Sequence, residues 1–569
     1  MVREMLAIGL ILTFTIASSV PLGRYIFRVF AHERTWLDPV LDPIERLVLR
    51  VTGVGPDQEQ DWQRYAYSLL ASNVIMWLVA WAVLTLQHAL PLNPDGIAGM
   101  EPLLAFNTAS SFTTNTDLQH YSGETGLSYF SQMFAITWLQ FVTAATGMAA
   151  AVATMRGLAG HRVPTVGHFY VDAIRAAVRV LLPLAVVVGL ILLWQGVPAT
   201  THGSVVATTV EGAPQAIARG VVAPLVAIKQ LGTNGGGYFG PNSAHPFENP
   251  TPLTNVVETW AILVIPMAMV WTLGHMVNRR RFAVTIFAVL LALFLPLVVV
   301  AVQQESAGNP AIARLGVDQA TGSMEGKEVR FGAALSALWA VSTTATSNGS
   351  VNAMHDSLTP LGGLMPFAAM WLNTIFGGVG VGFINLLVFI IVAAFIAGMM
   401  IGRTPELLGK KVEPREMKLA SLALLWHPLA ILLGTAVACV GWATTVDPGA
   451  ALGWLKNPGA HGFSEMLYEF TSAAANNGSG FEGLGDNTPF WNLSTGVVML
   501  LSRYIPIIAP LALAGSLGAK PSAPDTAGTL PADSATFGVT LWAVVVVLGL
   551  LMFMPVAVVG PIAEYLAQK

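Results

Sequence analysis

A glycine-rich segment in the middle of the chain reads Leu231-Gly232-Thr233-Asn234-Gly235-Gly236-Gly237. Apolar runs that are long enough to cross a membrane lie on both sides of it. Glycine permits left-handed backbone angles, which allow successive carbonyl groups to point in one direction. Carbonyl oxygens arranged in rings can replace the hydration shell of a potassium ion. The segment therefore indicates an ion-binding loop that re-enters the membrane.

Three further loops have the same character. Each lies between paired apolar runs and joins a short semi-polar stretch to a cluster of Thr, Ser, Asn and Gly. Such residues are also common in surface turns, but four loops of this kind on one side favour an internal repeat of helix, half-helix, loop and helix. Aligned on a central asparagine and separated by 119, 114 and 129 residues, the loops centre on Asn115, Asn234, Asn348 and Asn477.

The predicted potassium-binding filter combines oxygen ligands from all four loops. Hard oxygen ligands without a carboxylate cage suit a large monovalent cation better than Zn²⁺ or Mg²⁺. Potassium in this filter is therefore the only metal ion that we expect. The filter residues are predicted to be Thr113, Thr114, Asn115, Thr116, Gly232, Thr233, Asn234, Gly235, Gly236, Thr346, Ser347, Asn348, Gly349, Asn476, Asn477, Gly478 and Ser479.

The composition is that of a membrane protein. Of the 569 residues, 54% are hydrophobic and only 11% are charged, whereas soluble domains carry about 25% charged residues. The net charge of -4 and the lack of a basic tail argue against a nucleic-acid partner. The single cysteine, Cys439, excludes disulfides and thiolate metal clusters within the chain.

Ten apolar runs meet the length that a spanning helix needs, about 20 residues. The seventh run is too long for one straight helix and contains Gly377-Gly378-Val379-Gly380-Val381-Gly382, which predicts a broken helix. We expect an all-α integral membrane protein with four pseudo-symmetric helix–pore loop–helix repeats around a central filter, and one extra helix at each end. The runs lie at about 4–27, 65–88, 128–152, 172–195, 255–277, 282–303, 364–402, 418–443, 491–517 and 538–562.

Lys and Arg predict which connections are cytoplasmic. Arg279-Arg280-Arg281 follows the fifth run, for example, whereas the loop 89–127 has neither residue type. Both termini are therefore expected outside the cytoplasm. The predicted units are an N-terminal helix with its cytoplasmic loop (1–60), repeats at 61–160, 165–278, 279–412 and 413–520, and a C-terminal helix (535–569).

Several polar residues have two interpretations. Arg503 lies within the ninth run, where a charge costs about 2.5–3.5 kcal/mol; it either blocks leakage below the filter or extends to the membrane surface. Gly377, Gly378, Gly380 and Gly382 either form a gate beneath the filter or allow close helix packing. Four further polar residues follow the predicted filter loops: His245, Glu248, His355 and Asp356. They either brace the loops or form a metal or acid–base site.

One cytoplasmic loop is strongly basic. It is a positive-inside anchor or, secondarily, a docking surface for a cytoplasmic ATPase domain or anionic lipid. Its basic residues are Arg403, Lys410, Lys411 and Arg415.

The chain resembles a known family over essentially its whole length. The matching stretches include Thr113–Thr116, 231–237, His245–Thr251, Ser350–Ser357, Gly402–Glu406 and Ala474–Gly483. They resemble the potassium-binding A subunit of the bacterial Kdp potassium-transporting P-type ATPases. That family is similar to the channel-like potassium transporters, which have four membrane-pore-membrane repeats.

The resemblance implies a high-affinity uptake complex in the bacterial inner membrane. This subunit would bind periplasmic potassium and pass it through an intramembrane tunnel to a P-type ATPase subunit, which would hydrolyse ATP. Small single-span accessory subunits and membrane lipids would be further partners, and no cofactor or catalytic residue is expected. In keeping with this, the sequence has neither a phosphate-binding Gly-x-x-x-x-Gly-Lys-Ser/Thr loop nor an Asp-Lys-Thr-Gly phosphorylation motif.

One stretch departs from the family pattern. Asp117-Leu118-Gln119 follows Thr116 where Asn-Trp-Gln is typical, and we expect Asp117 and Gln119 at the outer mouth, where a carboxylate could concentrate cations. Two other functions stay open at this point. One is a stand-alone potassium channel or ion-gradient-coupled transporter; the other is a membrane-embedded enzyme, which would need clustered intramembrane His, Asp or Glu.

Overall fold

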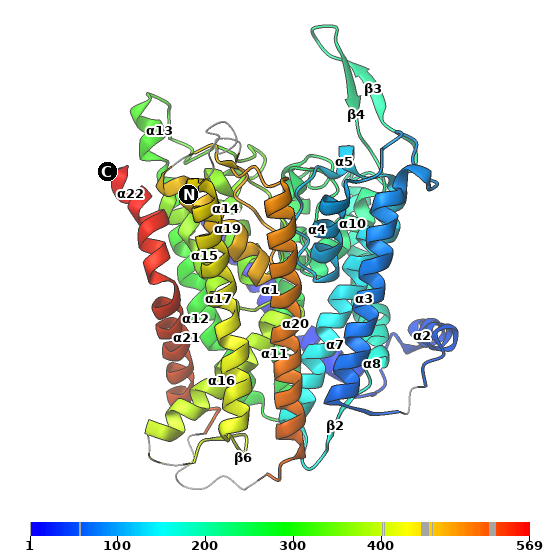
Figure 1. Ribbon diagram of the computed structural model, residues 1–569, viewed down its shortest axis with the longest axis vertical. Coiled ribbons are helices and arrows are strands. Elements are labelled where there is room, and N and C mark those ends of the chain that lie inside the picture. The colour runs from blue at the N-terminus through cyan, green and yellow to red at the C-terminus, as the bar shows by residue number, and fades with distance from the viewer. Residues whose placement is uncertain are drawn as a thin grey trace.

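The computed structural model describes residues 2–55, 58–400, 402, 404–444, 454–457, 459–522 and 531–568. These residues contain ten helices that are long and apolar enough to cross a membrane, and the long helices form one bundle (Figure 1). The predicted all-α membrane fold is confirmed.

One pattern occurs four times in the bundle: an outer helix, a short pore helix that ends inside the bundle, and an inner helix. In chain order the helices are α3 (Trp62–Leu86), α4 (Pro102–Thr113) and α7 (Trp138–Ala159); α8 (Phe169–Arg175) continued by α9 (Leu182–Trp194), α10 (Val222–Leu231) and α11 (Pro252–Met276); α12 (Arg280–Ala307), α14 (Gly332–Ala345) and the pair α15 (Pro360–Leu372) and α16 (Val381–Met400); α17 (Pro414–Thr444), α19 (Ala460–Ala475) and α20 (Pro489–Ala519).

Extra helices precede and follow the four repeats. α1 (Val2–Phe30) packs against α11, and α21 (Ala535–Ala557) packs against α12 and α16. Both termini lie at the same end of the bundle as the pore helices (Figure 1). This arrangement agrees with an even number of spans. The short helices are α5 (Gly123–Gly126), α6 (Tyr129–Ser131), α13 (Pro310–Arg314) and α22 (Ala563–Ala567).

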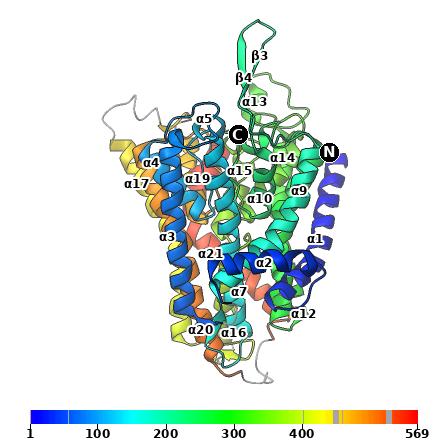
Figure 2. The same ribbon diagram turned by 90° about the vertical axis from the view of Figure 1, so that its right-hand side faces the viewer.

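Helix α2 (Asp38–Thr52) lies across the long axis of the bundle (Figure 2). Its acidic residues pair with arginines of the second repeat: Asp38 lies 2.7 Å from Arg179, and Glu45 lies 2.9 Å from Arg175. The sequence has an apolar and a charged side, so α2 has the character of a helix that lies along a membrane surface.

The strands are short and peripheral. Three antiparallel pairs join β1 (Gln60–Asp61) to β2 (Thr165–Gly167), β3 (Val205–Thr208) to β4 (Pro214–Ile217), and β5 (Glu406–Leu407) to β6 (Lys410–Lys411). The β3–β4 hairpin extends beyond the bundle at the end that carries the termini (Figure 1).

The seventh apolar run is broken, as its length predicted. α15 ends at Leu372, Asn373 adopts left-handed angles with φ 41°, and α16 begins at Val381. We call residues 373–380 the break segment. Its backbone turns back closely, because a Cβ on Gly377 would lie 2.3 Å from the carbonyl carbon of Gly382.

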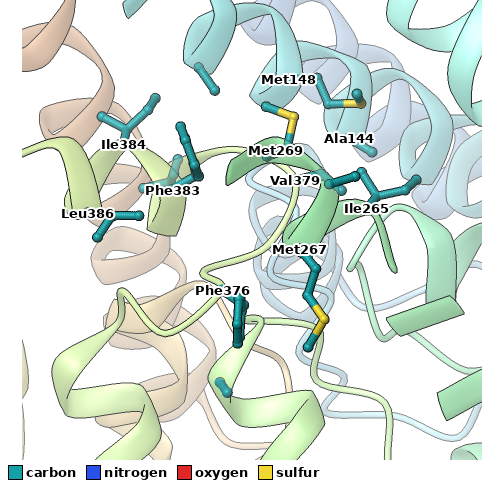
Figure 3. Close-up of a cluster of buried hydrophobic side chains, with 14 of the residues drawn as sticks. Ala144, Met148, Ile265, Met267, Met269, Phe376, Val379, Phe383, Ile384 and Leu386 are labelled. Carbon is teal, nitrogen blue, oxygen red and sulfur yellow. The ribbon is translucent and has the colours of Figure 1, made fainter. Parts of the chain in front are cut away.

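The break segment is buried in the centre of the bundle. Phe376 and Val379 are both about 1% exposed, and they extend into a cluster of apolar side chains that includes Ala144, Met148 and Ile265 (Figure 3). A non-helical backbone at this depth is tolerated only where protein surrounds it or where it lines a wet cavity.

Candidate functional site

The four pore helices lead into four loops with one backbone path. We call them pore loops 1 to 4 (residues 114–119, 232–237, 346–350 and 476–480). In each loop one backbone N–H donates to the carbonyl five residues earlier, at 2.8–3.0 Å. These donors are Thr116, Asn234, Asn348 and Asn477.

The backbone angles give the same alignment. Each of these four residues lies between two residues with left-handed angles, whose φ values are 46–58° before it and 57–107° after it. The preceding residues are Asn115, Thr233, Ser347 and Asn476, and the following residues are Asp117, Gly235, Gly349 and Gly478.

This alignment corrects the one predicted from sequence. Thr116, not Asn115, is the counterpart of Asn234, Asn348 and Asn477, so the sequence-based alignment of the first loop was wrong by one residue. The error arose because the sequence alignment matched asparagine residues with one another. The feature that the four loops share is the position of the residues with left-handed angles, and in loop 1 Asp117 stands where the other loops have glycine.

The loops contact one another in cyclic order. The amide of Asn115 donates to Thr233 O at 2.9 Å, joining loops 1 and 2. Asn348 donates to Lys229 O at 3.1 Å, which joins loop 3 to the pore helix before loop 2. Two adjacent asparagines complete the ring: Asn477 donates to Thr343 O and Asn476 donates to Thr116 Oγ1, both at 2.9 Å.

Glycine allows the backbones of neighbouring loops to approach closely at three positions. A Cβ on Gly235 would lie 2.1 Å from Asn348 O, one on Gly349 would lie 2.0 Å from Asn477 O, and one on Gly478 would lie 2.2 Å from Thr116 O. No side chain could occupy these spaces, so neighbouring loops touch backbone to backbone.

Four equivalent carbonyl groups in this ring lack a hydrogen-bond partner. Buried backbone carbonyls are paired in the great majority of cases. In the described ranges, however, no hydrogen bond ends on the carbonyl oxygens of Thr116, Asn234, Asn348 or Asn477, although each residue is about 0% exposed. A buried ring of oxygens without hydrogen-bond donors has the chemistry that could hold a cation.

Several predicted filter side chains brace the loops instead. Thr114 Oγ1 lies 2.7 Å from Thr116 Oγ1, Ser347 Oγ donates to Asn373 Oδ1 at 2.9 Å, and Ser479 Oγ donates to Asn477 Oδ1 at 2.6 Å. Thr346 Oγ1 donates to Ser342 O, and the Gly236 carbonyl accepts from Gln140 at 2.9 Å. Thr113 and Gly232 lie at the buried ends of their pore helices.

Asp117 and Gln119 lie between loops 1 and 2. Gln119 donates to Gly237 O at 3.0 Å and accepts from Gly237 N at 2.8 Å. Asp117 is only 1% exposed, and neither carboxylate oxygen has a hydrogen-bond partner among the described residues. Burial raises the pKa of Asp117 well above its usual range, while the neighbouring Gln140 side chain lowers it.

The break segment lies directly against the pore loops. Val379 N donates to Thr233 Oγ1 at 3.2 Å, and a Cβ on Gly378 would lie 2.6 Å from Thr346 O. Gly377, Gly378 and Gly380 therefore belong to this non-helical segment, whereas Gly382 lies in the first turn of α16. Gly380 also packs closely on α7, because a Cβ there would lie 2.5 Å from Gly147 Cα.

Arg503 lies in the same region. It is 5% exposed, and its guanidinium donates to Thr143 O of α7 at 3.4 Å. A Cβ on Gly147, one turn further along α7, would meet the Arg503 guanidinium at 3.0 Å and Gly380 Cα at 3.3 Å. The side chain is thus enclosed by protein and does not extend to the membrane surface.

Buried braces hold the second pore loop. Lys229 is fully buried and pairs with Glu248 and with Asn242 Oδ1, the latter at 2.6 Å. Asn242 in turn donates to Gly235 O at 2.5 Å. Lys229 was not among the residues predicted from sequence, although a single charged residue in the mostly apolar α10 could have indicated it.

The other polar residues behave mainly as braces. His245 stacks on Phe239 with ring centroids 3.8 Å apart, and His355 Nδ1 lies 2.9 Å from Tyr468 Oη. Asp356 is not only a brace, because its carboxylate lies 2.9 Å from His461 Nε2 in a separate cluster of ionisable side chains. In the basic cytoplasmic loop, Lys410 is buried and donates to Gly157 O at 2.8 Å, so it braces the loop against α7. Arg403, which belongs to the same loop, lies outside the described residues.

The chain is similar to proteins of known name over its whole length. A family model described as "KdpA: Potassium-transporting ATPase A subunit" matches residues 9–566. A relative from Flavobacterium psychrophilum is 49% identical over 100% of both chains, and one from Alicyclobacillus acidocaldarius is 51% identical over 99% of this chain and 98% of the relative. Both are named "Potassium-transporting ATPase potassium-binding subunit".

A solved structure has a similar fold. The potassium transporter TrkH from Vibrio parahaemolyticus matches with a TM-score of 0.51 over 90% of this chain and 98% of that chain, at 15% sequence identity. This likeness concerns the fold alone. The family model and the two relatives show that the chain belongs to the potassium-transporting ATPase A subunit family.

Proposed function

We propose that this multi-pass membrane protein is the potassium-binding and potassium-translocating subunit of an ATP-driven uptake complex. The observation that carries the proposal is the ring of four equivalent, buried carbonyl oxygens that accept no hydrogen bond from the described residues. Such oxygens can replace the hydration shell of a potassium ion. Potassium is the substrate of this site, and the four pore loops are its selectivity filter.

The pore loops face the periplasm in this proposal. The connections at the opposite end of the bundle carry most of the Lys and Arg residues, which favours the cytoplasmic side for that end. Both termini are then periplasmic, and the membrane is the bacterial inner membrane.

The break segment and Arg503 close the direct route to the cytoplasm. The segment donates to loop 2 through Val379 N, and buried apolar side chains surround it. A guanidinium just below the ring adds a positive charge that repels a potassium ion. The ion therefore leaves sideways through an intramembrane tunnel to a P-type catalytic subunit, which hydrolyses ATP; small accessory subunits complete the complex.

A glycine substitution in the ring tests the filter. In Gly478→Ala the new Cβ would lie 2.2 Å from Thr116 O, which forces loops 4 and 1 apart. We expect the potassium concentration for half-maximal ATPase stimulation of the purified complex to rise at least about tenfold, a loss of about 1.4 kcal/mol. The matched control is Gly480→Ala in the same loop, where the nearest atom lies 3.8 Å away.

Equal potassium dependence in the two variants would contradict the filter assignment. ATP-independent potassium flux from this chain alone would instead favour a channel or an ion-gradient-coupled transporter. The names of the similar proteins support the ATPase complex over those two alternatives.

A further inference from the structure

A second cluster of ligand-type side chains lies away from the ring. Ligand atoms of Asp356, His461 and Glu465 all lie within 4.8 Å of one another. The His461 imidazole contacts Asp356 Oδ1 at 2.9 Å through Nε2 and Glu564 Oε1 at 3.0 Å through Nδ1. We call these four residues the His461 cluster.

The cluster holds more negative charge than its neighbours balance. Three carboxylates share one imidazole, and in the part of the chain that the structure describes no lysine or arginine forms an ion pair with any of them. Burying carboxylates is costly unless a cation or hydrogen-bond donors compensate for the lost hydration.

Glu465 points to a missing positive partner. It is 0% exposed, its Oε1 accepts a 3.3 Å hydrogen bond from the Asn457 side chain, and its Oε2 has no partner among the described residues. Oε1 also lies 4.0 Å from His461 Nε2. A buried carboxylate oxygen without a donor, beside an imidazole and a second carboxylate, fits a metal ligand.

The histidine has the environment that metal-binding histidines have. Such a histidine usually binds the metal through one ring nitrogen and donates its other N–H to a carboxylate. Glu564 occupies that outer position at Nδ1, which leaves Nε2 facing Asp356 and Glu465. The side chains of His461 and Glu564 are each 18% exposed, so an ion could reach the cluster from the surface.

The backbone of Gly483 lies close to both carboxylates. A Cβ on Gly483 would lie 2.3 Å from Glu465 Oε1 and 2.8 Å from Asp356 Oδ2. Any larger residue at this position would therefore push the two carboxylates out of their present places.

We propose that Asp356, His461 and Glu465 bind a first-row divalent transition metal of the zinc class, with Glu564 orienting the histidine. One imidazole and two carboxylates suit zinc, manganese or iron better than magnesium, which prefers oxygen ligands alone. The cluster joins the turn after pore loop 3, the start of pore helix α19 and the C-terminal helix α22. A bound ion would therefore fasten the C-terminus to the outer end of the pore. This site is independent of the proposed potassium function.

Zinc binding to the full-length chain tests this proposal. The protein would be purified without a histidine tag, stripped with EDTA and titrated with ZnCl₂ by calorimetry, with thermal unfolding as a second readout. We expect one zinc ion per chain and a zinc-dependent rise in unfolding temperature. The visible absorption of Co²⁺ bound in place of zinc would report nitrogen and oxygen coordination.

Matched variants distinguish this site from others. Glu465→Gln keeps the shape of the side chain and should weaken zinc binding at least about 100-fold, whereas Glu564→Gln should weaken it about 10–100-fold. His461→Ala should abolish binding, and His202→Ala, at an exposed histidine, should not change it. Unaltered zinc affinity in Glu465→Gln and His461→Ala, or no zinc binding by the unmodified protein, would overturn the proposal. A cooperative thermal unfolding transition, recorded for each variant without metal, shows that the variant is folded.

Discussion

At the scale of single residues, Asp117 makes the ring asymmetric. Its backbone has the left-handed angles that glycine has in the other three loops, although aspartate adopts them less readily. Its carboxylate is buried without a hydrogen-bond partner in the described structure. One quarter of the ring thus carries an ionisable group next to the proposed potassium ligands, where the sequence analysis expected only an outer-mouth residue.

Asp117→Asn should change the pH dependence of potassium binding. Because burial raises the pKa of Asp117, the carboxyl is neutral at low pH and becomes charged as pH rises. The ionised form attracts a cation, so the apparent potassium affinity of the unmodified protein should increase with pH. The asparagine variant should bind more weakly at high pH, by about three- to tenfold, and show a flatter profile.

Potassium-stimulated ATPase activity at several pH values measures this effect. Glu211→Gln is the matched control, because it neutralises an exposed carboxylate in the β3–β4 turn at the same end of the molecule. Parallel pH profiles for Asp117→Asn and the unmodified protein would show that the carboxyl does not act on the ion.

At the scale of elements, hydropathy and run length predicted the spans because the bilayer fixes the length of a spanning helix. The break in the seventh run was predicted for the same reason, since 364–402 exceeds one span. The alignment of pore loop 1 with the other loops was not predicted correctly, because the four loops share a pattern of backbone angles and not a pattern of residue types. The pairing of Lys229 with Glu248 was also missed, since periodicity carries no information about which buried charges meet.

The break segment should act as a barrier to potassium. A Cβ on Gly380 would lie 2.5 Å from Gly147 Cα, so Gly380→Ala must push the segment away from α7. We expect the unmodified chain, reconstituted alone in liposomes, to pass little potassium, and Gly380→Ala to pass at least about tenfold more, which corresponds to a barrier lowered by about 1.4 kcal/mol.

Gly363→Ala in α15 is the control for this experiment, because its nearest new contact would be 3.5 Å away. A potassium-sensitive dye inside the liposomes records the flux. If the Gly380→Ala variant folds normally and passes no more potassium than the unmodified chain, another element closes the pathway.

At the scale of the whole molecule, the first and last repeats must meet to close the ring. His120, after pore loop 1, contacts Asn492 of α20 at 2.7 Å and Glu469 of α19 at 2.9 Å. These partners are more than 300 residues away in the chain, so neither local pattern nor hydropathy could have revealed them. Both ring nitrogens face oxygen atoms, because the amide nitrogen of Asn492 donates instead to Asn487 Oδ1. This arrangement favours the doubly protonated imidazolium.

Alkaline pH should loosen this junction. Burial alone would lower the pKa of His120, but the carboxylates of Asp486 and Glu469 raise it to about 9, compared with about 6.5 in the unfolded chain. The stabilisation is therefore complete below about pH 6.5 and is lost as pH rises through about 9, up to about 3 kcal/mol in total. The unfolding temperature should fall more steeply between pH 7 and about pH 10 in the unmodified protein than in His120→Gln, whereas His202→Gln should follow the unmodified protein. If His120→Gln and the unmodified protein lose stability in parallel, the imidazolium does not hold the two ends of the ring together.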